Sequence, residues 1–416
     1  MVISMVYVAI LGHGVVGSGV AEVLRKNADS IAHKAGEPIE IRRILDLREF
    51  PDLPYADKFT KEFDDILHDP DIRIVVETMG GLHPAYDFVK SCLLAGKNVV
   101  TSNKELVAAK GDELLEIAKN NNLNFLFEAS VGGGIPILRP IDQCLAANEV
   151  YEIAGILNGT TNFMLTRMIE DHMSFEDALA LAQKLGYAER NPSADVDGHD
   201  ACRKICILAS LAFGKHVYPE QIHTEGIGNI TLDDVKFAEA YGGVIKLIGR
   251  VSRLQDGRVS GLVAPMILPA ASLLADVNDV FNGIMVRGDA IGDVVFYGRG
   301  AGKLPTASAV VADVIDEVKH LGARKYLFWE RGAEGYVCDW KENAVSALVR
   351  FRCPETHAAL AQVNAVFSGA AIVSAPHAPA DQLAFVTPSM TEAELDAKLA
   401  SLQNMTLLSR LRVAEL

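Results

Sequence analysis

The chain has 416 residues, of which 50% are hydrophobic and 22% are charged, and its formal net charge is −15. This composition can bury large cores, which argues against a disordered chain, and a length of about 150 residues per domain predicts two or three domains. The acidic balance, without any run of Lys and Arg, argues against nucleic-acid binding, which needs a basic surface.

The six cysteines are typical of reduced thiols in a cytoplasmic protein. No C-x-x-C pair occurs, and no His-rich segment accompanies Cys202 and Cys206 to complete a zinc site. The apolar N-terminus lacks a basic segment and breaks at Gly12, so we expect a buried strand there rather than a signal peptide. Because no apolar stretch reaches the roughly 18 residues that span a bilayer, we expect no membrane partner.

Short apolar runs alternate with helix-like segments over residues 1–135. The expected strands are Val6–Leu11, Ile39–Leu47, Ile72–Glu77, Asn98–Thr101 and Asn124–Glu128. The expected helices are 18–27, 84–95 and 105–120. Strands that are apolar throughout are buried on both faces, and their alternation with helices predicts an α/β, doubly wound parallel sheet.

The later segments are expected to form a second and a third domain. Residues 136–297 read as an α+β domain, with strands at 151–157, 262–268 and 283–286 and helices at 163–169, 175–185 and 201–213. A strand at 294–297 and a helix at 307–320 follow, and residues 298–325 are expected to return to the first domain. Residues 340–416 read as a small β-α-β-β-α module: strand 347–352, helix 356–367, strands 371–374 and 382–386, and helix 392–403.

A glycine-rich motif, GHGVVG, directly follows the first strand and opens a helix. Gly12 permits the tight turn, Gly14 lets the backbone approach a pyrophosphate, and Gly17 permits close packing of the helix on the strand. The free N–H groups and dipole of the helix N-terminus would hold the phosphates. The expected cofactor contacts of this loop are Gly12, Gly14, Val15, Val16 and Gly17.

The second strand ends in a pair of charges, Asp46 and Arg48. Asp46 would bind a ribose 2′-OH and favour NAD, whereas Arg48 would neutralise a 2′-phosphate and favour NADP. A solvated charge pair is the alternative, and the cofactor preference stays open. Asp46 lies 29 residues after Gly17, more than the usual ~20, which indicates an extended helix or loop between them.

Two more segments are candidate ligand contacts in the first domain. Thr101-Ser102-Asn103-Lys104 ends a strand, at the edge where ligands bind in open α/β sheets, although Lys104 could be a surface lysine. The glycine loop at residues 298–302 could approach the cofactor from the far side or simply begin a helix.

The segment from Glu189 to Lys204 is rich in carboxylates. Asp200 and Lys204 are four residues apart at a helix start and share one face. An exposed salt bridge there would contribute only about 0.3–0.5 kcal/mol. A buried lysine tuned by carboxylates would instead serve as a general acid or base. The run Asn158–Asn162, which follows a strand, could grip a polar substrate, cap a helix, or do both.

Taken together, these segments resemble homoserine dehydrogenase from about Val6 to Ala323. The motifs that carry the resemblance are GHGVVG, SNKELVA, FEASVGGGIPI, GILNGTTNFML, GYAERNPSADVDGHDACRKICILA and YGRGAGKLPTASAV. That family reversibly reduces aspartate semialdehyde to homoserine with NAD(P)H, in the biosynthesis of threonine, methionine and isoleucine. The resemblance implies a Rossmann domain, a mixed-sheet catalytic domain, a small-molecule substrate, and a homodimer or homotetramer.

The resemblance also implies roles for individual residues. The catalytic residues would be Lys204 as acid/base, Asp200 as its partner, and Lys104 near substrate and nicotinamide. The substrate-binding residues would be Glu189, Asp195, Gly159 and Thr160. Further cofactor contacts would be Gly80, Thr101, Ser102, Lys104 and Gly300. A monovalent cation, Na⁺ or K⁺, would be bound by Glu128 and the carbonyls of Val131, Gly133 and Ile135.

The tail departs from the family pattern. Long members carry an ACT-like domain that usually senses threonine, and residues 347–352 and 356–367 fit its first strand and helix. The segment between them reads Arg352-Cys353-Pro354-Glu355, without the Asp-x-x-Gly type of effector turn, so we do not expect strong threonine feedback.

Two rival functions remain open at this point. One is another NAD(P)-dependent semialdehyde dehydrogenase, which would form a thiohemiacetal on Cys92 or Cys144. The other is a non-catalytic dinucleotide sensor, which would have no need for the Glu189–Lys204 segment.

Overall fold

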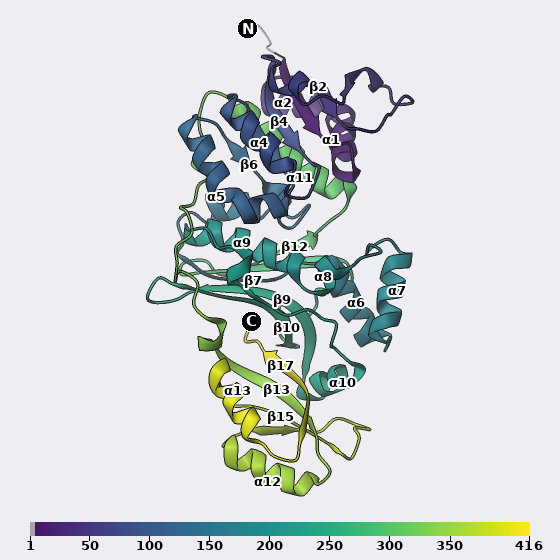
Figure 1. Ribbon diagram of the computed structural model, residues 1–416, viewed down its shortest axis with the longest axis vertical. Helices are drawn as coiled ribbons and strands as arrows, with labels where there is room; N and C mark the ends of the chain where they lie inside the picture. The colour runs from purple at the N-terminus through teal and green to yellow at the C-terminus, as the bar shows by residue number, and fades with distance from the viewer. Residues whose placement is uncertain (1–4) are drawn as a thin grey trace. The chain divides into compact units, whose positions relative to one another are not determined.

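The computed structural model describes residues 5–416 and divides into two compact units (Figure 1). The first unit runs up to Glu149 and also contains Cys206–Pro219 and Gly298–Ala333. The second unit consists of Val150–Ile205, Glu220–Tyr297 and Glu334–Leu416. No helix within residues 5–416 is long and apolar enough to cross a membrane.

The first unit is built on a six-stranded parallel sheet in the order β3-β2-β1-β4-β5-β6. Its strands are β1 (Val6–Leu11), β2 (Ile39–Leu45), β3 (Phe59–Thr60), β4 (Ile72–Glu77), β5 (Asn98–Thr101) and β6 (Phe125–Leu126). The strand order reverses between β1 and β4, so the crevice outside their carboxyl ends is the place where such sheets bind ligands.

Helices cover this sheet as the doubly wound prediction requires. They are α1 (Val15–Lys26), α2 (Ala28–Ala35), the short α3 (Asp64–Leu67), α4 (Ala85–Leu94), α5 (Lys104–Asn120) and α11 (Lys303–Lys319). Residues of α1, α2 and α11 share one apolar core with β1, β2 and β4. Helix α2 was not expected, and it explains the long spacing between Gly17 and Asp46.

The second unit contains an 11-stranded mixed sheet in the order β12-β11-β7-β9-β10-β17-β13-β15-β14, with β8 and β16 on side branches. Its first part comprises β7 (Val150–Ile156), β8 (His223–Thr224), β9 (Gly243–Arg253), β10 (Val259–Pro269), β11 (Phe281–Gly288) and β12 (Gly292–Arg299). The helices of this part are α6 (Gly159–Glu170), α7 (Phe175–Lys184), α8 (Ser193–Val196), α9 (His199–Phe213) and α10 (Leu232–Tyr241). Helix α9 begins in this unit, and its residues from Cys206 onward belong to the first unit. Strand β9 and helix α10 were missed by the sequence patterns.

The C-terminal module continues the same sheet. It comprises β13 (Ala344–Arg352), α12 (Thr356–Val366), β14 (Ala371–Val373), β15 (Gln382–Val386), β16 (Met390–Thr391), α13 (Glu392–Ser401) and β17 (Thr406–Val413). The predicted β-α-β-β-α order is wrong in omitting β17. That strand pairs antiparallel with β13 and parallel with β10, so the module is a β-α-β-β-α-β unit joined to the sheet beside it.

Candidate active site

The glycine-rich loop adopts the geometry that its spacing predicts. Gly12 has a φ of +91°, and a Cβ there would lie 2.9 Å from Met79 Cγ. A Cβ at Gly17 would lie 1.9 Å from the carbonyl oxygen of Gly12, so only glycine lets α1 start this close to β1. Gly14, at the N-cap of α1, faces open space instead. The free helix N-terminus is therefore accessible to an anion.

A cavity of about 680 Å³ opens beside this loop. Its walls include Gly12, Gly14, Asp46, Arg48, Met79 and Phe88. The rings of Phe63 and Phe88, both at this cavity, stack with centroids 4.0 Å apart. A cavity of this size with apolar walls and a charged rim suits the adenosine half of a dinucleotide.

Asp46 and Arg48 form an ion pair at the cavity. Arg48 donates from Nη2 to Asp46 Oδ2 at 2.8 Å and from Nε to Oδ1 at 2.9 Å. Asp46 Oδ2 also accepts the backbone N–H of His13 at 2.8 Å. The hydrogen bonds from Arg48 hold the pKa of the Asp46 carboxyl well below its usual range. Asp46 therefore ties the glycine-rich loop to the end of β2 while it anchors Arg48.

His13 anchors the loop from its other side, a role that the sequence patterns did not suggest. Its buried ring packs edge-on to Phe50, Tyr55 and Phe59, with centroid distances of 4.7, 5.9 and 5.0 Å. His13 Nε2 lies 3.1 Å from the Tyr55 hydroxyl. Burial lowers the pKa of His13, so the imidazole is neutral in this aromatic setting.

Glu77, the last residue of β4, is a second residue that the sequence reasoning missed. Its fully buried carboxylate accepts the N–H groups of Met79 at 2.7 Å and Gly80 at 3.3 Å, and the Thr101 hydroxyl at 2.5 Å. Burial raises the pKa of Glu77. The signal in the sequence was a glutamate that ends a strand directly after the unbroken apolar run Ile74-Val75-Val76. Through these bonds Glu77 joins the turn after β4 to the end of β5, where cofactor contacts were expected.

Lys104 is the first residue of α5, directly beyond that edge of the sheet. Asn103 caps the helix, because its Oδ1 accepts the N–H of Leu106 at 3.1 Å. Asn103 Nδ2 also donates to the carbonyl of Gly81 at 2.7 Å. The start of α5 is thus fixed to the turn that carries Gly80.

In the second unit, Lys204 and Asp200 form a buried pair on α9. Lys204 Nζ donates to Asp200 Oδ2 at 2.7 Å and to the carbonyl of Leu157 at 2.7 Å. The two groups do form the helix salt bridge of the alternative, but their side chains are only 9% and 5% exposed, so this salt bridge is buried. Asn158 Nδ2 donates to Asp200 Oδ2 at 2.8 Å and to Asp195 Oδ1 at 2.7 Å. One amide therefore holds two carboxylates beside one ammonium group.

The carboxyl of Asp195 has a different environment. Burial raises its pKa, and the charge of Asp200 raises it further, whereas the hydrogen bond from Asn158 lowers it. A buried carboxyl whose pKa is raised by burial and by a charged neighbour is common at functional sites.

The start of α6 lies against this cluster. Asn158 also caps α6, since its Oδ1 accepts the N–H of Thr161 at 2.8 Å, so the capping role considered for this run is present. The Thr160 hydroxyl donates to the carbonyl of Tyr187 at 2.7 Å. Glu189 lies two residues beyond Tyr187 and is exposed. Gly159 is required here, because a Cβ would lie 2.7 Å from the carbonyl oxygen of Val280.

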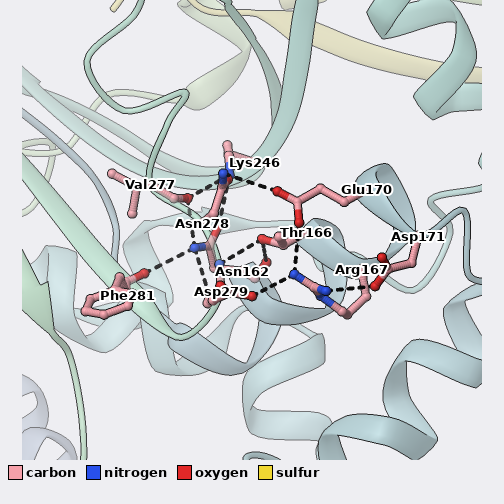
Figure 2. Close-up of polar contacts among 10 residues, drawn as sticks. All are labelled: Asn162, Thr166, Arg167, Glu170, Asp171, Lys246, Val277, Asn278, Asp279 and Phe281. Carbon is pink, nitrogen blue, oxygen red and sulfur yellow. Dashed lines mark hydrogen bonds and ion pairs between the residues drawn. The ribbon is translucent and has the colours of Figure 1, made fainter.

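A polar network holds the loop that approaches Gly159 (Figure 2). Asn162 Nδ2 donates to the carbonyls of Val277, Asp279 and Phe281 at 3.0, 3.0 and 3.1 Å. Lys246, on β9, donates from Nζ to the Val277 carbonyl at 2.7 Å. It also donates to Asn278 Oδ1 at 2.8 Å. The sequence reasoning did not single out Lys246, because β9 itself was not predicted.

The predicted cation ligands lie in a tight glycine turn of the first unit. The Glu128 carboxylate accepts the N–H groups of Ile137, Leu138 and Arg139 at 2.6, 2.9 and 2.7 Å. Gly133 has a φ of +55°, and a Cβ there would lie 2.4 Å from the carbonyl oxygen of Gly300. The glycine turn at 132–134 and the glycine loop at 298–302 are therefore in direct contact. The Glu128 carboxylate thus already accepts three hydrogen bonds from the residues that follow this turn.

The cysteines do not resemble catalytic nucleophiles. Cys92 is fully buried in α4, and burial raises the pKa of its thiol to about 12. Cys144 is exposed at the end of a single π-helical turn, Pro140–Cys144. A thiohemiacetal mechanism needs an activated thiolate, which burial of Cys92 opposes.

Known families match both units. A family model described as the NAD-binding domain of homoserine dehydrogenase matches residues 12–128. A second, described as homoserine dehydrogenase, matches residues 136–315. The chain belongs to the homoserine dehydrogenase family. It is thus an NAD(P)-dependent oxidoreductase, which excludes the non-catalytic sensor and confirms the resemblance drawn from the motifs.

Individual homoserine dehydrogenases support this assignment. Those of Pseudomonas aeruginosa and Synechocystis are 44% and 45% identical to the chain over 315 and 321 residues. These matches cover 76% and 75% of this chain and 72% and 73% of those proteins. The crystal structure of the Thiobacillus denitrificans homoserine dehydrogenase aligns with a TM-score of 0.90 at 34% identity, over 99% of this chain and 98% of that one. This alignment includes the tail, and it confirms the α/β fold with a parallel and a mixed sheet.

Proposed function

We propose that Lys204 is the general acid that protonates the aldehyde oxygen of L-aspartate 4-semialdehyde as it is reduced to L-homoserine. Bound NAD(P)H supplies the hydride to the aldehyde carbon. The observation that carries the proposal is the buried contact of Lys204 Nζ with Asp200 at 2.7 Å. A buried ammonium group held by a carboxylate can give its proton to a developing alkoxide, and the Leu157 carbonyl still orients the neutral amine afterwards.

The neighbouring residues have roles in substrate binding. Glu189 would bind the substrate ammonium group, and Asp195 the hydroxyl end. The first turn of α6 presents the backbone N–H groups of Gly159 and Thr160, which have no partner within the helix and suit an anionic carboxylate. Lys104 would stabilise charge that develops on the substrate oxygen.

Both cofactors should serve this reaction. The Asp46–Arg48 pair leaves a guanidinium group, 63% exposed, at the cavity together with Lys61. These cations suit a 2′-phosphate, whereas Asp46 suits a 2′-hydroxyl. An archaeal homoserine dehydrogenase in complex with NADPH aligns with this chain at a TM-score of 0.65 and 28% identity, over 75% of this chain and 97% of that one.

Several broader features are also proposals. The hard carbonyl oxygens of Val131, Gly133 and Ile135, with Glu128 beside them, suit Na⁺ or K⁺. We further propose a cytoplasmic homodimer or homotetramer. The division into residues 1–135 with 298–325, 136–297 and 340–416 describes its dinucleotide-binding, catalytic and ACT-like parts.

The test is a turnover assay with homoserine and each dinucleotide, before and after treatment with iodoacetamide. We expect reduction of either dinucleotide, unaffected by alkylation, because no cysteine takes part in the reaction. Loss of activity with alkylation of Cys92 or Cys144 would favour the thiohemiacetal enzyme instead.

A further inference from the structure

A buried arginine of the C-terminal module forms an ion pair with a carboxylate outside that module. Arg412, on β17, has a side chain that is 3% exposed. Its Nη1 and Nη2 each donate to one oxygen of Glu225 at 2.8 Å. Its Nε donates to Glu392, at the start of α13. Arg412 thus joins one carboxylate of the module to one that follows β8, in a bidentate geometry that only a guanidinium group offers.

The module holds the same short segment at a second point. The ring of His223, on β8, stacks on Trp340 with centroids 3.8 Å apart and planes inclined by 10°. His223 Nε2 lies 2.7 Å from Glu225 Oε1. The N–H of Glu225 donates to the Val263 carbonyl of β10 at 2.8 Å. The segment 223–225 is therefore fixed by Arg412, by Trp340 and by strand β10.

This segment is packed backbone-to-backbone on α8, the short helix that carries Asp195. The N–H of Ile227 donates to the carbonyl of Val196 at 2.9 Å. A Cβ at Gly226 would lie 2.3 Å from that same oxygen. A Cβ at Gly198 would lie 3.0 Å from Thr224 Cγ2. At Gly226 no side chain separates the two backbones, so a shift of one displaces the other.

We propose that Glu225 is a positioning residue: Arg412 holds it, and through the contact of Ile227 with Val196 it sets the position of Asp195 for substrate. The proposal rests on the substrate-binding role proposed for Asp195. It gives the C-terminal module a direct part in substrate affinity although Arg412 lies outside the Asp195–Lys204 cluster.

The ionisation of Glu225 agrees with this role. Burial raises its pKa, but the hydrogen bonds and charge of Arg412, followed by those of His223, lower it overall to about 2. Glu225 is therefore a carboxylate at any working pH. Glu225→Gln removes the charge, while the volume of the side chain is kept.

The test compares two variants that break the Arg412–Glu225 ion pair with two matched control variants, all in the full-length chain. Glu225→Gln and Arg412→Met should raise the KM for homoserine about tenfold or more, since small displacements of binding groups are costly. The kcat and the KM for NADP should change less than about threefold. Arg412→Lys, which keeps the charge but not the bidentate geometry, should fall between wild type and Arg412→Met.

The controls separate this route from general loosening of the module. Arg352→Met removes an ion pair with Asp381 at 3.4 Å, which lies within the module and shares no partner with Arg412. Arg350→Met removes a second ion pair that a buried arginine of the module makes with the catalytic part, in which Arg350 Nε donates to Asp234 of α10 at 3.0 Å. We expect the homoserine KM of both controls to stay within about threefold of wild type.

Hydrogen exchange supplies a readout that does not depend on turnover. The amide of Ile227 should exchange about tenfold faster in Glu225→Gln and Arg412→Met than in either control. An unchanged homoserine KM in both link variants, or an equal rise in Arg350→Met, would overturn the proposal. If Lys204→Ala kept normal turnover, the proposed function would fail. Faster exchange at Ile227 in Glu225→Gln and Arg412→Met would still support the proposed contact from Arg412 through Glu225 to α8.

Discussion

Lys204 Nζ lies 2.7 Å from Asp200 Oδ2, one helical turn away, and both side chains are almost completely buried. The pair is more than a local salt bridge, because Asn158 bonds Asp200 and Asp195 with the same amide nitrogen. An ammonium group that is desolvated and partnered in this way is ready to deliver its proton to one oxygen atom.

Replacing Lys204 should therefore abolish most of the catalysis. We expect Lys204→Ala to lower kcat by on the order of 10²–10⁴, the usual loss on removing a general acid. Dinucleotide affinity, measured by fluorescence titration, should be nearly unchanged, since the glycine-rich loop lies in the other unit. Lys184→Ala, at an exposed lysine of α7, is the control. Normal turnover of Lys204→Ala would contradict the assignment.

Arg48 should distinguish the two dinucleotides. We expect measurable activity with both NAD and NADP, with kcat/KM values that differ by less than about 10⁴. Arg48→Ala should raise the KM for NADP far more than that for NAD, because it removes the cation nearest to a 2′-phosphate. Arg48→Lys keeps the charge, so its KM for NADP should lie between that of the wild type and that of Arg48→Ala. A larger preference in the wild type would mean that a single residue decides the choice.

Threonine should inhibit this enzyme little, even at millimolar concentration. The turn before α12 has few free donors, because Pro354 lacks an N–H and the N–H of Cys353 donates to the Asp381 carbonyl at 2.7 Å. The measurement is an inhibition curve with homoserine as substrate. Strong, saturable inhibition would show that threonine binds by other groups.

Removal of the C-terminal module should loosen the oligomer. Deletion after about Ala344 removes β17, which pairs with β10, and leaves Glu225 and Asp234 without the arginines that neutralise them. Loss of the arginine that neutralises a buried carboxylate such as Asp234 is costly, so the remaining sheet should lose order at this edge. Sedimentation of the truncated chain checks this, and an unchanged sedimentation coefficient per subunit mass would contradict it.

Lys246 should make stability depend on pH in the alkaline range. Burial lowers the pKa of Lys246 from 10.5 to about 8. Between these values the unfolded chain binds more protons than the folded one, so the contribution to stability rises with pH through this window. The full change is about 3 kcal/mol. Urea unfolding of wild type and Lys246→Met between pH 7.5 and 10 should show this difference, whereas the exposed Lys236→Met should follow the wild type.

Local chemistry was enough to predict the parts of the site that depend on neighbours in the chain. The tight turn at Gly12 and the shared face of Asp200 and Lys204 follow from backbone sterics and helical periodicity, which act over a few residues. Five of the six strands of the parallel sheet were predicted for the same reason, since apolar runs need no partner to be recognised, whereas the two-residue β3 was missed.

Tertiary structure alone decided the groups whose partners lie far along the chain. Strand β9 carries Lys246, and β17 carries Arg412, and both charges interrupt the apolar pattern that marks a buried strand. Lys246 is tolerated because the Val277 carbonyl and the Asn278 side chain, some 30 residues later, accept hydrogen bonds from its Nζ. Arg412 is tolerated because Glu225, 187 residues earlier, pairs with it. A buried charge is stable only where the fold supplies its partner. Since that partner lies far along the chain, the residues next to the charge in the sequence do not reveal it.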